Sequence, residues 1–302
     1  MKSLLIILFA CSCLSGVGEA KLNVVATTPD LGALATEIGG DRVEVKVLAK
    51  PTEDPHFADA KPSHIVTLNR ADVLIEGGAE LEIGWLPALL ESSRNVKIGA
   101  GGPGRIVASR GITMLEVPTS FDRSKGDVHA LGNPHFLLDP LNAKIVAGQI
   151  AERFTQLDPP GKESYQAKRA QFDSALDAKL GEWQKRLAPY QGAKIVTYHR
   201  DFQYFANRFG LEVIETLEPK PGIPPSAAHL AKVIEKMKVN GARVILIQPF
   251  QSHKTAESAA RPTNAKVLDF PQQPGAIKNT ETYIKLMDYL VGTLASTLKE
   301  KP

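Results

Sequence analysis

The sequence predicts an α/β protein with two Rossmann-like lobes, each built on a parallel sheet. A long rigid helix joins the two lobes. In both halves of the chain, short β-branched runs alternate with helical patterns, which is typical of strand–helix–strand units and parallel sheets. Between the halves, residues 162–187 form one polar-rich run with an apolar stripe at helical spacing. The stripe consists of Phe172, Leu176, Leu180, Trp183 and Leu187. We therefore expect a helix along the body of the protein, with Trp183 as a packing residue.

The first twenty residues have the features of a secretory signal. Met1-Lys2-Ser3 precedes an apolar run at residues 4–10 and small residues that end at Ala20, an order of features typical of cleaved export signals. The run is too short to span a bilayer, so we expect no transmembrane span in the mature chain. Leu8-Phe9-Ala10-Cys11 is an alternative lipoprotein processing site, but Phe9 is bulky where small residues are expected. We favour simple cleavage over lipid anchoring.

Composition limits the possible partners and ligands. Both cysteines, Cys11 and Cys13, lie in the predicted signal, so a metal site in the mature chain must use nitrogen and oxygen. Cleavage removes one positive and one negative charge and leaves the formal net charge at +3. No basic run is interleaved with aromatic residues, so we expect no nucleic-acid partner. The length and the hydrophobic fraction of 43% predict a packed core and two domains. We expect the protein to be a monomer.

The N-terminal lobe, expected over residues 21–140, opens as strand, helix, strand. Residues 22–26 form a buried strand, and Thr28-Pro29-Asp30 provide a cap and a proline for a helix that stops at Gly39-Gly40. The other predicted elements are strands at 43–48 and 71–78 and helices from 61 and at 81–90. Residues 101–132, rich in Gly, Pro, Ser and charges, are expected to be mostly loop.

A helical segment, expected over residues 141–188, leads to the C-terminal lobe at 189–302. Asp139-Pro140 opens a helical pattern that Asp158-Pro159-Pro160-Gly161 ends, and the long helix follows. The C-terminal lobe repeats the strand–helix pattern without a residue-level repeat. Its predicted strands are at 194–198, 211–214, 244–247 and 265–269, and its helices at 201–209, from Ser226, at 252–260 and at 280–298.

Four residues are the candidate metal ligands. His56 and His199 come after predicted strands, and Asp269 ends one. His135 lies in the segment that leads into the helices between the lobes, and prolines precede His56 and His135. Since ligands bind at the carboxyl ends of parallel strands, we expect these side chains to meet in the cleft between the lobes. Three neutral imidazoles and one carboxylate form a tetrahedral shell that suits Zn²⁺, whereas more oxygen ligands would favour Mn²⁺.

We favour interpretations other than metal binding for the remaining histidines. His64, His229 and His253 lie in predicted helices in unrelated settings, and we expect no metal role for them. His129, six residues before His135, has two interpretations: an accessory contact to the metal, or a solvated loop histidine, which we favour. An aspartate that ends a strand is often only a turn or cap residue, so water is the alternative to Asp269 as fourth ligand.

Several motifs resemble those of the metal-binding solute receptors of bacterial zinc/manganese ABC importers. They are, in order, Asp54-Pro55-His56, Gly132-Asn133-Pro134-His135-Phe136-Leu137-Leu138-Asp139-Pro140, Thr197-Tyr198-His199-Arg200-Asp201-Phe202 and Glu218-Pro219. The resemblance covers nearly the whole mature chain. It implies two lobes bridged by a rigid helix, one Zn²⁺ or Mn²⁺ in the cleft, and delivery to a membrane permease driven by an ATPase.

The resemblance also implies ligand roles for His56, His135 and His199. Histidine at the third position is the zinc-type choice, whereas manganese-type members have a carboxylate there. Two features depart from the family pattern: the interval 121–132 lacks a long His/Asp/Glu-rich loop, and Asp269 fits the fourth position loosely.

We therefore expect a periplasmic receptor that captures Zn²⁺ with high affinity. A manganese receptor of the same type is one alternative. A secreted zinc hydrolase or hydratase with a three-histidine site is another, but the sequence has no His-Glu-x-x-His helix and no evident general base. Nothing in the residues argues for surface adhesion.

Overall fold

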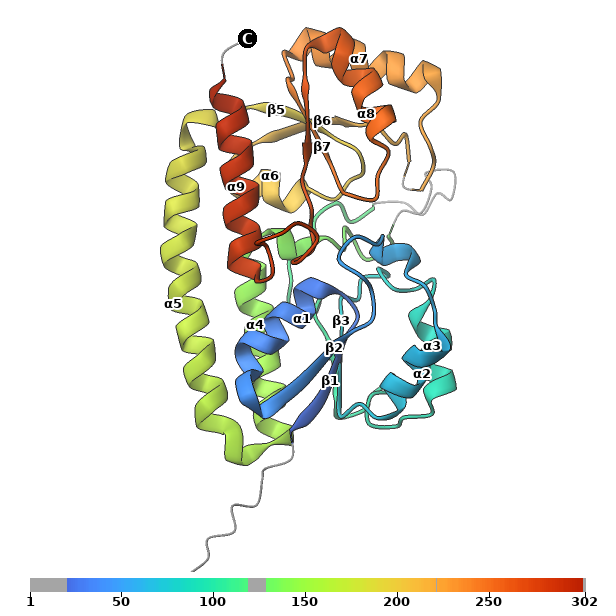
Figure 1. The fold of residues 1–302 in the computed structure, drawn as a ribbon, viewed down its shortest axis with the longest axis vertical. Helices are drawn as coiled ribbons and strands as arrows, with labels where there is room; N and C mark the ends of the chain where they lie inside the picture. The colour runs from blue at the N-terminus through green and yellow to red at the C-terminus, as the bar shows by residue number, and fades with distance from the viewer. Residues whose placement is uncertain (1–20, 119–128, 221, 301–302) are drawn as a thin grey trace, which may run out of the picture.

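Two four-stranded parallel sheets, one in each half of the chain, form the centre of the fold (Figure 1). The computed structural model describes residues 21–118, 129–220 and 222–300. The strand orders are β2-β1-β3-β4 and β6-β5-β7-β8, so the same topology occurs twice. The strands are β1 (Leu22–Ala26), β2 (Val43–Val47), β3 (Val73–Glu76), β4 (Arg105–Val107), β5 (Lys194–Thr197), β6 (Glu212–Thr216), β7 (Val244–Ile247) and β8 (Lys266–Asp269). The predicted fold class is confirmed.

The helices begin where the sequence supplies prolines and capping side chains. Prolines open α1 to α4, and the Asp139 carboxylate accepts a hydrogen bond from Leu141 N at the start of α4. Ser226 caps α7 as predicted. The helices are α1 (Pro29–Gly39), α2 (Pro62–Asn69), α3 (Leu86–Ser93), α4 (Pro140–Leu157), α5 (Lys162–Leu187), α6 (Gln203–Phe209), α7 (Ala227–Asn240), α8 (His253–Ala260) and α9 (Tyr283–Lys299).

The predicted long helix is confirmed as α5. It contacts α1 and α4 of the N-terminal half and α9 of the C-terminal half, and Figure 1 shows it extending along one side of the molecule past both sheets. Trp183 is buried, and its indole N–H donates to Asp288 Oδ1 of α9 at 2.8 Å. This residue packs the helix onto the C-terminal lobe, as expected. No described helix is both long and apolar enough to cross a bilayer.

Two segments differ from the prediction. Residues 105–107 form β4, which pairs with β3 inside the stretch expected to be mostly loop; three residues are too few to show an alternating pattern, and pairing with β3 makes them a strand. The helix predicted at 81–90 begins only at Leu86. Before it, residues 79–85 form a turn. The carboxylate of Glu82 in this turn accepts hydrogen bonds from Gly77 N at 2.7 Å and Gly78 N at 3.1 Å, which ties the turn to the end of β3.

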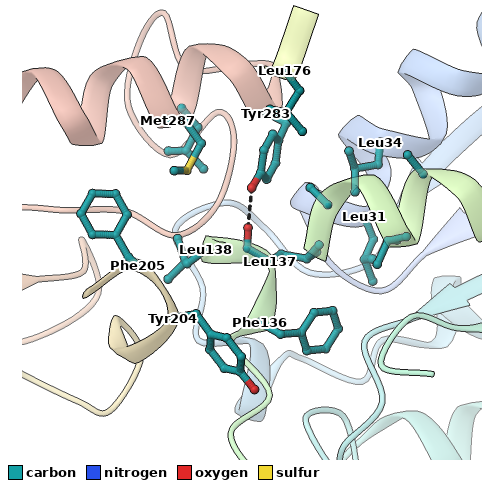
Figure 2. Packing of buried hydrophobic residues seen from close by; sticks show 14 of the residues in the cluster. Leu31, Leu34, Phe136, Leu137, Leu138, Leu176, Tyr204, Phe205, Tyr283 and Met287 are labelled. Atoms are coloured by element: carbon teal, nitrogen blue, oxygen red, sulfur yellow. Dashed lines mark hydrogen bonds between the residues drawn. The ribbon is translucent and has the colours of Figure 1, made fainter. Parts of the chain in front are cut away.

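The two halves share one continuous hydrophobic core. The short 3₁₀ helix η4 (Phe136–Leu138) is buried within it, and Figure 2 shows η4 between residues of α1 on one side and of α6 and α9 on the other. Tyr283 of α9 donates a hydrogen bond to the carbonyl of Leu137 at 2.6 Å. The segment that follows His135 is therefore anchored by both halves. The lobe boundaries at residues 140 and 188 stay a prediction, and the predicted signal at 1–20 lies outside the described residues.

Glu82 makes the stability of the protein depend on pH. Burial raises the pKa of this carboxyl from its ordinary value of 4.5 to about 7. Between these values the folded state binds more protons than the unfolded state, so stability falls as pH rises, by at most about 1.4 kcal/mol per pH unit for one group. Glu82→Gln should remove this contribution. Urea unfolding of both metal-free proteins at pH 5 and pH 7.5 measures it, and parallel profiles would contradict the assignment.

Candidate metal centre

Three histidines that are far apart in sequence meet between the two sheets. His56 lies in the short 3₁₀ helix η2 (Pro55–Phe57), His135 directly precedes η4, and His199 follows β5. Each offers one ring nitrogen, and these atoms all lie within 4.8 Å of one another. The ring centroids are 5.1 to 5.5 Å apart. The structure thus brings together three of the four candidate ligands.

Local chemistry presents each of these rings. Asp54 caps η2, and its Oδ1 accepts a hydrogen bond from His56 N at 3.0 Å. Gly132 has a φ of +100°, and a Cβ added there would lie 2.9 Å from Leu115 O, so the turn before His135 requires glycine. His199 lies two residues after Thr197, the last residue of β5. The Oγ1 of Thr197 donates a hydrogen bond to the His199 carbonyl at 2.6 Å.

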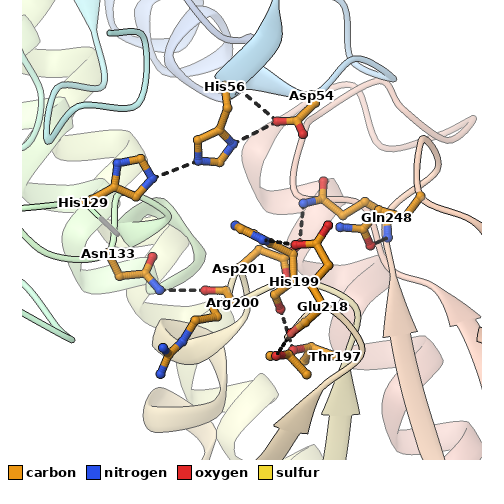
Figure 3. A network of polar contacts seen from close by, with 12 residues as sticks. Asp54, His56, His129, Asn133, Thr197, His199, Arg200, Asp201, Glu218 and Gln248 are labelled. Carbon is orange, nitrogen blue, oxygen red and sulfur yellow. Dashed lines mark hydrogen bonds and ion pairs between the residues drawn. The ribbon is translucent and has the colours of Figure 1, made fainter. Parts of the chain in front are cut away.

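Asn133 connects the segments that carry His135 and His199. Its Oδ1 accepts from His135 N at 3.0 Å, and its Nδ2 donates to the carbonyl of Arg200 at 2.6 Å (Figure 3). Glu116 binds both the Asn133 amide, at 2.8 Å, and the Arg200 guanidinium, at 2.7 Å. Two of the imidazoles are therefore held in register before any ligand arrives.

The Nδ1 atom of each imidazole faces a hydrogen-bond acceptor. Asp54 Oδ1 lies 2.9 Å from His56 Nδ1, Gln272 Oε1 lies 2.9 Å from His135 Nδ1, and Glu218 Oε2 lies 2.8 Å from His199 Nδ1. Two of these contacts are drawn in Figure 3. Because Nδ1 donates to these oxygens, the Nε2 lone pairs are left for a ligand. Such acceptors orient and strengthen metal-binding imidazoles.

One atom of this cluster lacks a partner. His135 is 6% exposed, and its Nε2 is buried with no hydrogen bond to any described residue. Buried polar atoms are nearly always satisfied. A cation between the three Nε2 atoms would satisfy this one.

The electrostatics keep part of the cluster neutral. Burial, together with His56 and His199, holds the pKa of His135 well below its ordinary value of 6.5. Burial and the same two neighbours lower the pKa of His129 to about 4. For His199, burial lowers the pKa, but the hydrogen bond to Glu218 and nearby carboxylates raise it more. His135 and His129 are therefore uncharged at neutral pH, the form that binds metals.

His129 also lies at this cluster, although the sequence favoured a solvated loop histidine over an accessory contact. Its Nε2 is 3.1 Å from His56 Nε2, and the two rings stack with centroids 5.1 Å apart. The side chain is half-buried and lines the cleft that contains the other three imidazoles. The interpretation of His129 as a solvated loop residue is wrong. Its proximity to His135 in the sequence was the only available signal.

Asp269 is not brought to the three imidazoles. It is the last residue of β8, its side chain is about half exposed, and its Oδ1 pairs with His253 Nε2 at 2.9 Å. The chain reaches the cleft only three residues later, where Gln272 contacts His135. Sequence reasoning missed the acceptor roles of Gln272 and Glu218, although both follow predicted strand ends. His229 Nε2 contacts Thr216 O at 3.0 Å, and His64 lies in α2, outside the cluster.

Known proteins are similar to this chain in sequence and fold. The family model described as zinc-uptake complex component A, periplasmic, matches residues 24–297. The iron-binding protein YfeA of Yersinia pestis is 29% identical over 285 residues, which cover 91% of this chain and 86% of that protein. The manganese ABC transporter substrate-binding lipoprotein PsaA of Streptococcus anginosus is 22% identical over 303 residues, 96% of this chain and 94% of that protein.

A solved structure agrees with these matches. The crystal structure of ZnuA superposes with a TM-score of 0.79 and 26% identity, covering 92% of this chain and 99% of that one. The matched region includes both sheets, α5 and all four cleft histidines. The chain therefore belongs to the zinc-uptake complex component A family, a family of metal-binding substrate-binding proteins of ABC transporters that are receptors and not enzymes.

Proposed function

We propose that this protein is a periplasmic receptor that captures Zn²⁺ with high affinity and delivers it to the permease of an ABC importer. His56, His135 and His199 bind the ion through Nε2. The observation that carries the proposal is the convergence of these three imidazoles, each with Nδ1 facing an acceptor, around the unpartnered Nε2 of His135. A site with this geometry binds a cation and needs no reactive group.

The donor set favours zinc over the other metals named for the relatives. Those names include iron for YfeA and manganese for PsaA. No carboxylate belongs to the described group of ligand atoms, and Asp54 and Glu218 are engaged with Nδ1 atoms. Imidazole nitrogen suits Zn²⁺, whereas Mn²⁺ prefers oxygen ligands and binds more weakly than zinc at a given nitrogen site.

The predicted signal determines where the receptor would act. Cleavage after Ala20 would release a monomeric periplasmic chain, whereas lipidation at Cys11 would anchor it to a membrane. In either position the receptor would work with a membrane permease and its ATPase, as substrate-binding proteins of ABC transporters do. We favour the cleaved form because Phe9 is poorly suited to lipoprotein processing.

Competitive titration of the metal-free protein tests this function. We expect one equivalent of Zn²⁺ to bind, with an affinity more than about tenfold above that for Mn²⁺ or Fe²⁺, as the metal order at nitrogen sites predicts. Tighter binding of Mn²⁺ or Fe²⁺ than of Zn²⁺ would overturn the assignment of zinc, and the protein would still be a receptor of the same type. The absence of any tight site would overturn the receptor itself. A crystal of the protein as purified, with anomalous scattering data, would identify the ion and its ligands directly.

A further inference from the structure

The three imidazoles leave a tetrahedral zinc site one ligand short. Zn²⁺ in structural protein sites is almost always four-coordinate. Asp269, the expected fourth ligand, is paired with His253 instead. The cleft wall nevertheless contains a further imidazole, His129, beside the three.

His129 lies near enough to His56 to share a cation with it, and it would have to move closer to His135 and His199, because its ring nitrogens are outside the group of His56, His135 and His199 atoms that all lie within 4.8 Å of one another. Ligand nitrogens about 2.0–2.1 Å from a tetrahedral zinc lie roughly 3.3 Å apart, and His129 Nε2 lies 3.1 Å from His56 Nε2. Because Nδ1 of His56 donates to Asp54, Nε2 of His56 is an acceptor. In the metal-free protein a proton on His129 Nε2 can occupy the gap. On cation binding, His129 would take its tautomer with the proton on Nδ1, so that the Nε2 lone pairs of both His129 and His56 face the ion.

The backbone around His129 is held in place. Gly132 N donates to the His129 carbonyl at 3.1 Å, which closes a turn and directs His129 back toward the cluster. Ala130 N donates to Glu80 Oε2 at 2.5 Å. This hydrogen bond ties the turn to the N-terminal lobe, which also carries His56.

Glu80 itself is held in a costly conformation. Ala79 and Glu80 have φ values of +50° and +66°, a region that residues other than glycine rarely adopt. Each such residue costs about 1 kcal/mol or more, and such residues cluster at functional sites. Here the conformation places a carboxylate in the cleft wall, against the backbone next to His129.

From this geometry we infer that His129 is the fourth metal ligand, positioned by Glu80. The site is then a shell of four imidazole nitrogens that selects Zn²⁺ against the oxygen-preferring Mn²⁺. This inference rests on the proposed receptor function, because it assumes that the other three histidines bind the ion. It differs in assigning the fourth place to a histidine of the segment before His135, with no carboxylate ligand.

Removal of His129 tests the ligand role. We expect His129→Ala to lower Zn²⁺ affinity at least about tenfold, since loss even of an outer-shell partner costs about 10–100-fold. The affinity for Mn²⁺ should change less, so the ratio of Zn²⁺ affinity to Mn²⁺ affinity should fall. X-ray absorption of the zinc-loaded proteins should show four imidazoles in the natural protein and three in the variant. His253→Ala, which removes a half-exposed histidine outside the cleft, should change neither measurement.

The outcomes separate the two proposals. If the natural protein binds zinc tightly and His129→Ala binds it equally well with the same absorption spectrum, the four-nitrogen shell is wrong and the receptor stands. If the natural protein has no tight site, both fail.

Two substitutions of Glu80 test the positioning role. Glu80→Gln keeps an oxygen acceptor for Ala130 N and should retain most of the zinc affinity. Glu80→Ala removes the acceptor and should weaken zinc severalfold, within the range of about 10–100-fold known for supporting residues, without changing the number of imidazoles. Equal affinity in both variants and the natural protein would overturn the role of Glu80. An equal loss in both would make Glu80 a ligand and overturn its assignment as a positioning residue.

Discussion

His135→Ala is expected to abolish tight zinc binding by the metal-free protein. His135 is the most buried of the three clustered histidines, and its Nε2 has no other described partner. Zinc binding of about 10–16 kcal/mol, shared among four ligands, corresponds to roughly 3 kcal/mol for each, or more than about a hundredfold in affinity. Isothermal titration in the presence of a competing chelator measures the loss.

A matched histidine provides the control for this substitution. His229 contacts the Thr216 carbonyl and lies outside the cluster, so His229→Ala should bind zinc as the natural protein does. Urea unfolding of metal-free His135→Ala establishes that the variant is folded, because the side chain also contacts Gln272. A folded variant with undiminished affinity would exclude His135 from the site.

Arg208→Ala is expected to destabilise the metal-free protein by about 3 kcal/mol. Arg208 of α6 donates to both carboxylate oxygens of Asp139, each at 2.7 Å, and the Asp139 side chain is only 8% exposed. Removal of one partner of a buried pair leaves an uncompensated charge, which costs about 3–5 kcal/mol; the partial exposure of Arg208 favours the lower end. Urea unfolding monitored by Trp fluorescence measures the change.

An exposed arginine gives the comparison for this second experiment. Arg261 pairs with Glu257 one helical turn away, and its side chain is 81% exposed. Exposed pairs contribute about 0–1 kcal/mol, so Arg261→Ala should leave the free energy of unfolding nearly unchanged. Similar losses in the two variants would mean that the Asp139–Arg208 pair contributes no more than a surface pair.

The Arg208 result bears on the site as well as on stability. Asp139 caps α4 immediately after η4, and η4 follows His135. The same carboxylate therefore joins α6 of the C-terminal lobe to the segment that presents a proposed ligand. This arrangement, with Tyr283 bound to the Leu137 carbonyl, indicates that His135 is held rigidly between the lobes.

The sequence by itself determined the features whose signals are local. Helix starts followed from residues such as Asp139-Pro140 and Ser226, because capping depends on neighbours a few positions away. The apolar stripe from Phe172 to Leu187 predicted α5, because the spacing of apolar residues along a helix can be seen in the sequence itself. The convergence of His56 and His199 followed from the rule that carboxyl ends of parallel strands meet at one edge, and that of His135 from its place before the helices between the lobes.

Only the tertiary structure decided features that depend on distant partners. Three residues became β4 because β3 lies beside them. Residues 81–85 form a turn where a helix was expected, and Glu82 in this turn binds the backbone of Gly77 and Gly78. Distant partners also explain why His129, and not Asp269, lies in the cleft. The position of a residue in a strand or loop does not determine the direction of its side chain. Asp269 is paired with His253, 16 positions away, and the backbone next to His129 is bound by Glu80, 50 positions from Ala130. Three of the four candidate ligands predicted from the sequence thus lie together, but the other side chains around them depend on how the folded chain packs.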